Sequence, residues 1–98
     1  MSTDPAPRPF DLDAPWCLTA QVSVRPERFG ALMYHFGTRR LSFLKSPTLL
    51  SVVRDLGNCP TARDACVRAG VPAADLPAYH SALATLAKSD MIRMRSAP

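Results

Sequence analysis

The sequence predicts an α+β domain in which an antiparallel sheet is followed by three helices. Two observations lead to this class. Side chains between residues 16 and 44 alternate with the two-residue period of strands, whereas apolar residues recur at helical spacing from residue 47 onward. With 98 residues and 47% apolar composition, the chain is long enough for one domain with a modest core.

The N-terminal segment, residues 1–15, is rich in proline and has no periodic apolar pattern. Such a composition predicts a flexible arm, so the folded domain is expected at residues 16–95. The domain opens with an alternating stretch that predicts one first strand, and a polar turn follows at residues 25–28. The apolar members of that strand are Trp16, Leu18, Ala20, Val22 and Val24.

Residues 29–47 give the strongest local pattern, a hairpin that leads directly into a helix. Gly37 and Thr38 supply a turn in which a positive φ costs little. Ser46 and Pro47 then provide an N-cap hydroxyl and a proline at the first helical position. The two strands follow from alternation of Leu32, Tyr34 and Phe36 with Ala31, Met33 and His35, and again over residues 40–44.

Three helical segments come next. The first covers residues 47–56 and stops at Gly57. The second begins at Thr61, where Thr-Ala-Arg-Asp resembles a capping box, and ends at Gly70. The third has Asp75 as its expected N-cap. Their apolar stripes are Leu49, Val52, Val53 and Leu56; Ala62, Ala65, Cys66 and Ala69; and Leu76, Tyr79, His80, Leu83, Leu86 and Ala87.

The second and third helices, joined through a Gly-Val-Pro turn, resemble a helix-turn-helix pair. With the hairpin attached, they predict a winged helix-turn-helix domain. Ser89 and Asp90 break the last helix, and Met91, Ile92 and Met94 suit either a short terminal strand or a packed tail. The predicted fold is therefore a three-stranded antiparallel sheet followed by three helices.

The composition indicates which kinds of partner and which cellular location to expect for the chain. A net charge of +4, with ten arginines against two lysines, suits an acidic partner, although a solvated basic surface has the same composition. No run approaches the ~18 apolar residues of a membrane span. The N-terminus lacks the apolar stretch of a signal peptide. A cytoplasmic protein without membrane contact is expected.

The sequence offers no motif for catalysis or metal binding. Cys17, Cys59 and Cys66 form no CxxC pair, and His35 and His80 are distant from them in sequence, so no metal site is expected. Cys66 is expected in the core. There is no Gly-rich phosphate loop, HExxH or nucleophile elbow. We therefore expect no catalytic residues, no cofactor and no enzyme activity.

The segment YHFGTRRLSFLK (residues 34–45), with DAPW before it and ADLPAY after it, resembles a known family. The family comprises the peptide recognition elements of pathways that make ribosomally synthesised, modified peptides. The similarity is greatest to the small peptide chaperones of mycofactocin biosynthesis, and those of pyrroloquinoline quinone biosynthesis share the layout. The resemblance covers residues 13–92, and the hairpin motif is its specific portion.

The resemblance implies a winged helix-turn-helix fold and a mycofactocin precursor peptide as the partner. The peptide would add as a strand to the edge of the third strand and lie in the cleft beside the third helix. The domain would then present the peptide to a radical S-adenosylmethionine (radical SAM) maturase, and would perform no chemistry itself.

The third strand, residues 40–44, contains no proline, so all its N–H groups are available as donors. From alternation we expect Leu41 and Phe43 in the core and Leu44 beside the cleft. Arg39 and Arg40 either clamp an acidic peptide side chain or form a solvated hairpin tip. The expected peptide-binding residues are Arg39, Arg40, Leu41, Ser42, Phe43 and Leu44, with Leu76, Tyr79, His80 and Leu83 from the third helix, for which ordinary helix packing is the alternative.

The main alternative is a winged-helix DNA-binding regulator. Such a protein reads bases with Arg, Asn or Gln on its recognition helix and contacts phosphates with Lys or Arg. The third helix offers only Lys88 among these types, and its outward positions include Ala78, Ser81, Ala82 and Thr85. A nucleic-acid partner is therefore not expected. A third possibility is a structural subunit whose hairpin docks permanently on a larger enzyme.

Overall fold

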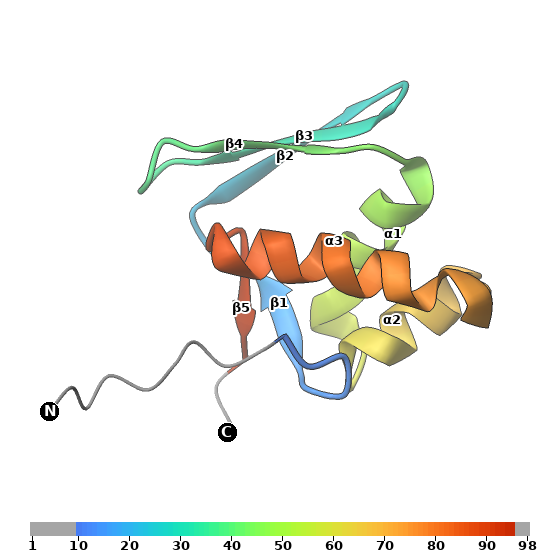
Figure 1. The fold of residues 1–98 in the computed structure, drawn as a ribbon. Coiled ribbons are helices and arrows are strands. Elements are labelled where there is room, and N and C mark those ends of the chain that lie inside the picture. Colours follow the sequence, from blue (N-terminus) through green and yellow to red (C-terminus); the bar gives the residue numbers. More distant parts are fainter. Residues whose placement is uncertain (1–9, 96–98) are drawn as a thin grey trace, which may run out of the picture.

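The computed structural model describes residues 10–95 and has the predicted α+β composition, with two antiparallel sheets and three α-helices. In Figure 1 the larger sheet forms one layer and the helices lie together against one side of it. The strands are β1 (Trp16–Leu18), β2 (Val22–Glu27), β3 (Gly30–His35), β4 (Leu41–Leu44) and β5 (Ile92–Met94). The helices are α1 (Pro47–Asp55), α2 (Ala62–Arg68) and α3 (Leu76–Lys88), with short 3₁₀ turns η1 (Leu56–Asn58) and η2 (Ala73–Asp75).

The first strand expected from the sequence is in fact two strands in different sheets. β2, β3 and β4 form a three-stranded sheet in that order, whereas β1 pairs separately with β5. The break occurs at Thr19, whose backbone N–H donates to the Met91 carbonyl and whose hydroxyl donates to the Asp90 carbonyl. These bonds attach the chain to the C-terminal segment, and the sheet ladder begins again at Val22.

The polar stretch expected as a turn at residues 25–28 is also largely strand. β2 continues to Glu27, and Pro26 is opposite Ala31 of β3. A proline is acceptable here because β2 is an edge strand, so its missing N–H costs no ladder bond when that position points outward. The short terminal strand, one of two options for the C-terminal segment, is present as β5.

The helices begin where the sequence indicated. The Ser46 hydroxyl accepts from the Leu49 N–H at 3.0 Å, and the Thr61 hydroxyl accepts from the Asp64 N–H at 3.1 Å. Asp75 occupies the N-cap position of α3, as expected, although its side chain makes no cap hydrogen bond. The stripes of α1 and α2 are in the core, which includes Leu49, Val52, Val53, Leu56, Ala62, Ala65 and Cys66.

Residues 10–15, assigned from the sequence to the flexible arm, are packed against the domain. Phe10, Leu12 and Ala14 are buried. The carbonyls of Leu12 and Ala14 accept hydrogen bonds from the N–H groups of Arg63 and Ala62, which the first turn of α2 leaves without helical partners. The rest of the expected arm, residues 1–9, lies outside the described part of the chain.

The winged helix-turn-helix assignment stays a prediction, because the strands divide into a three-stranded and a two-stranded sheet. Within residues 10–95, no helix is long and apolar enough to cross a membrane.

Candidate functional site

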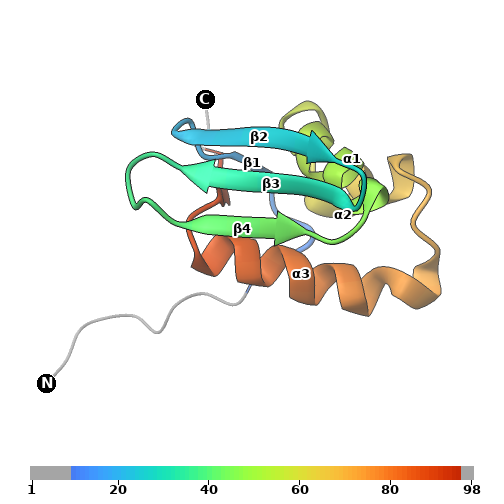
Figure 2. The same ribbon diagram turned by 90° about the horizontal axis from the view of Figure 1, so that it is seen from above.

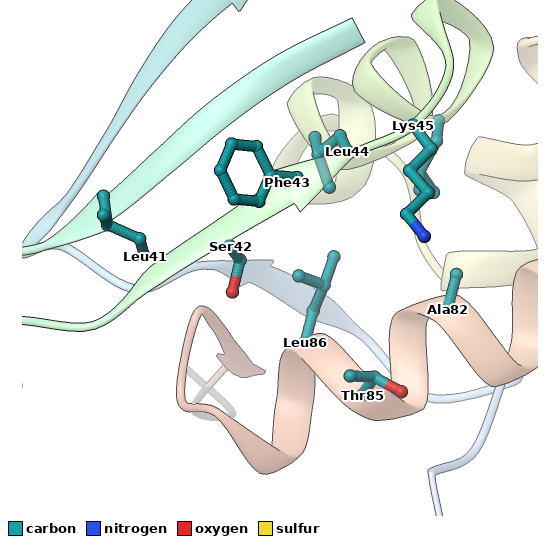
Figure 3. Close-up of a pocket in the computed structure, with 9 residues that line it drawn as sticks. Leu41, Ser42, Phe43, Leu44, Lys45, Ala82, Thr85 and Leu86 are labelled. Atoms are coloured by element: carbon teal, nitrogen blue, oxygen red, sulfur yellow. The ribbon is translucent and has the colours of Figure 1, made fainter. Parts of the chain in front are cut away.

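A groove of about 460 Å³ separates the free edge of β4 from α3. Figure 3 shows β4 on one side of it and α3 on the other, with the Leu86 side chain rising from the helix toward the strand. The wall is mainly aliphatic, with hydroxyls from Ser42 and Thr85 and one ammonium group from Lys45. The lining residues are Leu41, Ser42, Phe43, Leu44, Lys45, Leu49, Ala82, Thr85 and Leu86.

A second hollow of about 170 Å³ extends the groove toward the start of α3. It shares Lys45, Leu49 and Ala82 with the first and adds Tyr79 to the wall. The two hollows therefore form one channel along the helix. Small side chains on α3 keep the channel open, because Ala78 and Ala82 leave room that a larger residue would fill.

The β3–β4 register decides which β4 side chains face the groove. Ala31 and Met33 are fully buried and are opposite Leu44 and Ser42, so these four share the inner face of the sheet. Leu41 and Phe43 alternate to the outer face and are 56% and 61% exposed. The expectation that Leu41 and Phe43 are core residues is therefore wrong, and Leu44 is the core residue of this strand.

The error has a simple physical cause. Strand alternation separates two faces but does not say which of them is buried, and a shift of one residue exchanges them. The larger pair of apolar side chains suggested the wrong face. The inner face is set by the neighbouring strand, where the completely buried Met33 fixes the orientation of β3.

Within residues 10–95, the backbone of β4 presents unpaired groups to the groove. The His35 N–H donates to the Arg40 carbonyl at 2.9 Å, which makes residues 35 and 40 a hydrogen-bonded pair. Hydrogen-bonded and non-hydrogen-bonded pairs alternate along an antiparallel ladder. The next hydrogen-bonded pair is therefore Met33 and Ser42, which are opposite each other in register. The N–H and C=O groups of Leu41 and Phe43 then point away from β3, toward the open edge beside α3.

Gly30 controls where the C-terminal end of β4 lies. Its φ of +151° is a conformation that favours glycine. A Cβ at this position would clash with the Leu44 carbonyl and would come within 2.8 Å of the Ser46 nitrogen. The close approach brings the end of β4 and the N-cap of α1 against the start of β3.

His35 holds the other end of β4. Its Nδ1 accepts from the N–H groups of Gly37 and Thr38 at 3.0 and 3.1 Å. An Nδ1 that accepts carries no proton, so Nε2 bears the hydrogen that is directed to the Asp90 carboxylate 3.3 Å away. The ring is 2% exposed and therefore fastens the β3–β4 turn to the loop after α3.

The structure brings only some of the predicted residues to the groove. Leu41, Ser42, Phe43 and Leu44 line its first part, and Tyr79 lines the second. Arg39 and Arg40 are exposed in the turn before β4, where Arg39 has a φ of +62°. Neither arginine is among the lining residues.

The other predicted residues of α3 have packing roles. Leu83 is fully buried in the core, and Leu76 is half-buried against it. The His80 Nε2 lies 3.0 Å from the Phe10 carbonyl oxygen, and its ring meets the Phe10 ring edge-on with centroids 5.4 Å apart. His80 therefore holds the N-terminal segment, which is the structural alternative considered for it.

Sequence reasoning missed Lys45, Leu49, Ala82, Thr85 and Leu86 as groove residues. Ala82 and Thr85 were interpreted as outward positions of a recognition helix. A signal was available, because Tyr79, Ala82 and Leu86 are spaced by three and four residues and share one stripe of the helix.

The described part of the chain contains no group of three or more His, Cys, Asp or Glu residues placed to hold a metal ion. Cys66 is fully buried, as expected, and burial raises the pKa of its thiol although Arg63 opposes the shift. A buried neutral thiol is a core group rather than a nucleophile. The groove is suited to binding, with backbone donors and acceptors on one wall and apolar side chains on both.

Comparison with known proteins identifies a family for the chain. The model of the Peptide chaperone MftB family matches residues 15–93. The chain belongs to this family. The match confirms the resemblance found from the hairpin motif, and because the MftB family is one of chaperones, the chain is not an enzyme.

Three curated relatives carry the name peptide chaperone MftB. That of Mycobacterium ulcerans (strain Agy99) is 57% identical over 83 residues, covering 85% of this chain and 76% of the relative. That of Mycobacterium tuberculosis (strain ATCC 25618 / H37Rv) is 55% identical with the same coverage. That of Mycolicibacterium smegmatis (strain ATCC 700084 / mc(2)155) is 52% identical, covering 85% of this chain and 81% of the relative. No solved structure matches the chain significantly.

Proposed function

We propose that the protein binds the mycofactocin precursor peptide as an added strand on β4 and presents it to a radical SAM maturase. The observation that carries this proposal is the open β4 edge beside an apolar groove. Leu41 and Phe43 direct their backbone groups to this edge. A peptide strand paired there occupies the space between β4 and α3.

The two walls of the groove have different roles in this proposal. Main-chain bonds from β4 supply affinity that does not depend on the peptide's side chains. Selection comes from α3 and α1, where Ala82, Leu86 and Leu49 accept an apolar peptide side chain of matching size. Lys45 at the junction of the two hollows favours a carboxylate in the neighbouring peptide residue.

The residues proposed to contact the peptide differ from the first expectation in two respects, the removal of three residues and the addition of five. Leu41, Ser42, Phe43, Leu44 and Tyr79 are retained, because they line the channel. Arg39 and Arg40 are retained as solvated cations for acidic peptide residues beyond the channel. Leu76, His80 and Leu83 act by positioning α3 and its neighbours. Lys45, Leu49, Ala82, Thr85 and Leu86 are added.

Calorimetric titration with a synthetic precursor peptide tests the proposal, with an Ala82→Trp variant to fill the groove. The matched control is Ala73→Trp, which adds the same side chain at an exposed position of η2. We expect one-to-one binding by the wild type and by the control, and a loss of about tenfold or more for Ala82→Trp. Equal affinity of all three proteins contradicts binding in this groove.

Duplex DNA in the same experiment tests the winged-helix regulator. Binding of DNA with a steep salt dependence, together with no binding of the peptide, contradicts the chaperone proposal. A titration with the maturase present tests presentation, because the chaperone must hold peptide and enzyme together.

A further inference from the structure

The outer face of the three-stranded sheet carries an exposed apolar cluster. Figure 2 views the strands from above, and among residues 10–95 no helix or strand lies over them. Phe43 and Leu41 are opposite Leu32 and Tyr34 in register, which forms two adjacent rows of large side chains. The cluster, named here the outer patch, consists of Phe29, Leu32, Tyr34, Phe36, Leu41 and Phe43.

Contacts within the outer patch hold its rings in place. The Phe29 and Phe43 rings have centroids 6.2 Å apart, and Tyr34 meets Phe36 edge-on with centroids 5.0 Å apart. Phe36 is nevertheless 63% exposed and Phe29 47%. Single exposed apolar residues are common, but several contiguous aromatic residues on a sheet face mark an interaction surface.

Positive charge surrounds the outer patch. Residues 21–45 contain five basic residues and one acidic residue, whereas the rest of the chain contains seven of each. The whole net charge of +4 therefore belongs to the segment that builds the sheet. Arg25 is opposite Leu32 in register, Arg28 lies in the β2–β3 turn, and Arg39 and Arg40 lie in the β3–β4 turn, all exposed.

This charge distribution argues against a second copy of the chain on the outer patch. A symmetric pair through this face would set the four arginines of one copy near those of the other. The acidic residue of the segment, Glu27, is paired with Arg25 at 3.3 Å. An occupant with an apolar centre and a carboxylate border is complementary instead.

We propose that the outer patch is the docking surface for a folded protein whose contact region is apolar and bordered by carboxylates, namely the modifying enzyme. This identification rests on the proposed function, which gives the chaperone an enzyme partner. Leu41 and Phe43 also line the peptide groove, so an enzyme seated on the patch lies directly beside the bound peptide. The edge and the outer face of β4 thus serve two partners, with the peptide at the edge and the enzyme on the outer face.

Aromatic residues and arginine together are the composition of protein interface centres. The same composition also suits an anionic lipid surface, which the test distinguishes. The test uses a double variant, Phe29→Ser with Phe36→Ser, because neither residue lines the groove. The matched control is Val67→Ser, which removes an apolar side chain that is 64% exposed on α2.

The experiment measures the affinity of each protein for the radical SAM maturase, and separately for the precursor peptide. We expect the double variant to bind the enzyme ~30-fold more weakly or worse, while its peptide affinity stays within about twofold of wild type. The Val67→Ser protein is expected to match wild type in both. Circular dichroism melting of each variant establishes that it is folded.

Three results overturn the inference, and a fourth overturns the proposed function on which it rests. Unchanged enzyme affinity of a folded double variant removes the outer patch from the interface, while the peptide-binding proposal stands. An equal loss of enzyme affinity in Val67→Ser shows that removing any exposed apolar side chain weakens binding, so the effect is not specific to the outer patch. Binding to vesicles of phosphatidylserine and phosphatidylcholine, lost in the double variant while enzyme affinity is unchanged, makes the patch a lipid surface. If wild type binds peptide but never the enzyme, presentation itself fails.

Discussion

The two edges of the three-stranded sheet differ in what they offer to another chain. At the β4 edge, Leu41 and Phe43 direct backbone groups into a groove beside α3. At the β2 edge, the Phe36 N–H donates to the Gln21 carbonyl at 2.9 Å. By alternation from that bond, Val24 and Pro26 direct their backbone positions outward, and Pro26 has no N–H to donate. The Val22 N–H already donates to the Thr19 carbonyl at 3.0 Å.

The difference shows how one sheet separates a receptive edge from a blocked one. Proline on an edge strand removes a donor where it would attract another strand, without loss of an internal ladder bond. Figure 2 shows β4 running beside α3, whereas β2 lies at the opposite side of the sheet. Backbone donors and a side-chain groove therefore occur together at β4, which is the combination that strand addition requires.

The largest expected effect comes from Gly30→Ala. The added Cβ clashes with backbone atoms of Leu44 and Ser46, and alanine is strained at a φ of +151°. We expect the free energy of unfolding to fall by about 3 kcal/mol, with loss of peptide binding because the end of β4 moves. Gly70→Ala is the control: its φ is +86°, but a Cβ there meets nothing within 4 Å. Urea unfolding that gives equal losses for both variants contradicts the role of close approach at Gly30.

Proline substitution at neighbouring β4 positions tests the assigned bonding pattern. Ser42→Pro removes a ladder bond to Met33 and is expected to cost on the order of 3 kcal/mol of stability. Phe43→Pro removes an outward N–H, so the protein should remain folded but bind the peptide about tenfold more weakly. Phe43→Ala keeps the N–H and serves as the control for the lost ring. Stability losses in the reverse order would show that the bonding pattern is shifted by one residue.

Pro26→Ala tests the blocked edge. The substitution restores an outward N–H at β2, and the greater freedom of the unfolded chain lowers stability by about 0.5–1 kcal/mol. Peptide affinity should be unchanged in calorimetry, since β2 has no part in binding. Self-association measured by sedimentation should rise, because two edges are then available for pairing. A gain in peptide affinity would contradict the assignment of binding to β4 alone.

The smallest effect is expected away from both edges, at the Asp13–Arg63 pair that joins the N-terminal segment to α2. Arg63 donates to the Asp13 carboxylate at 2.7 Å and holds its pKa below the usual value. A lowered folded-state pKa means that the unfolded chain binds more protons near pH 4, so stability falls as pH decreases through that range. Both groups are exposed, so the contribution is small. Thermal melts of Asp13→Asn should differ from wild type at pH 7 and converge with it once the pH is well below the ordinary pKa of an aspartate; a difference that persists there contradicts the ion-pair explanation.

The sequence predicted the parts of the fold that depend on local chemistry. Ser46 and Thr61 cap helices through their own hydroxyls, and Gly37 lies in the turn between the two strands of the hairpin, although the positive φ of that turn is at Arg39 rather than at Gly37 or Thr38. These features depend on residues a few positions apart, so a linear sequence contains them. The family resemblance likewise depended on the contiguous hairpin motif.

The features it did not predict depend on distant contacts. Nothing near Thr19 in sequence indicates that Asp90 and Met91 bond to it and interrupt the strand. The face of β4 that is buried depends on Met33 and the helices below it. One groove residue of α3, Ala82, was missed because large apolar side chains were taken as the sign of a binding surface. Ala82 instead shapes the groove by being small.

The most direct test of strand addition is amide hydrogen exchange, followed by NMR, on the free protein and on its complex with the precursor peptide. The Leu41 and Phe43 amides should exchange rapidly in the free protein and become protected in the complex. The Ser42 amide should be protected in both states because it is bonded to β3, and the outward β2 amide of Val24 should not change. A saturated complex in which Leu41 and Phe43 stay unprotected, or in which protection appears at β2 instead, contradicts binding at the β4 edge.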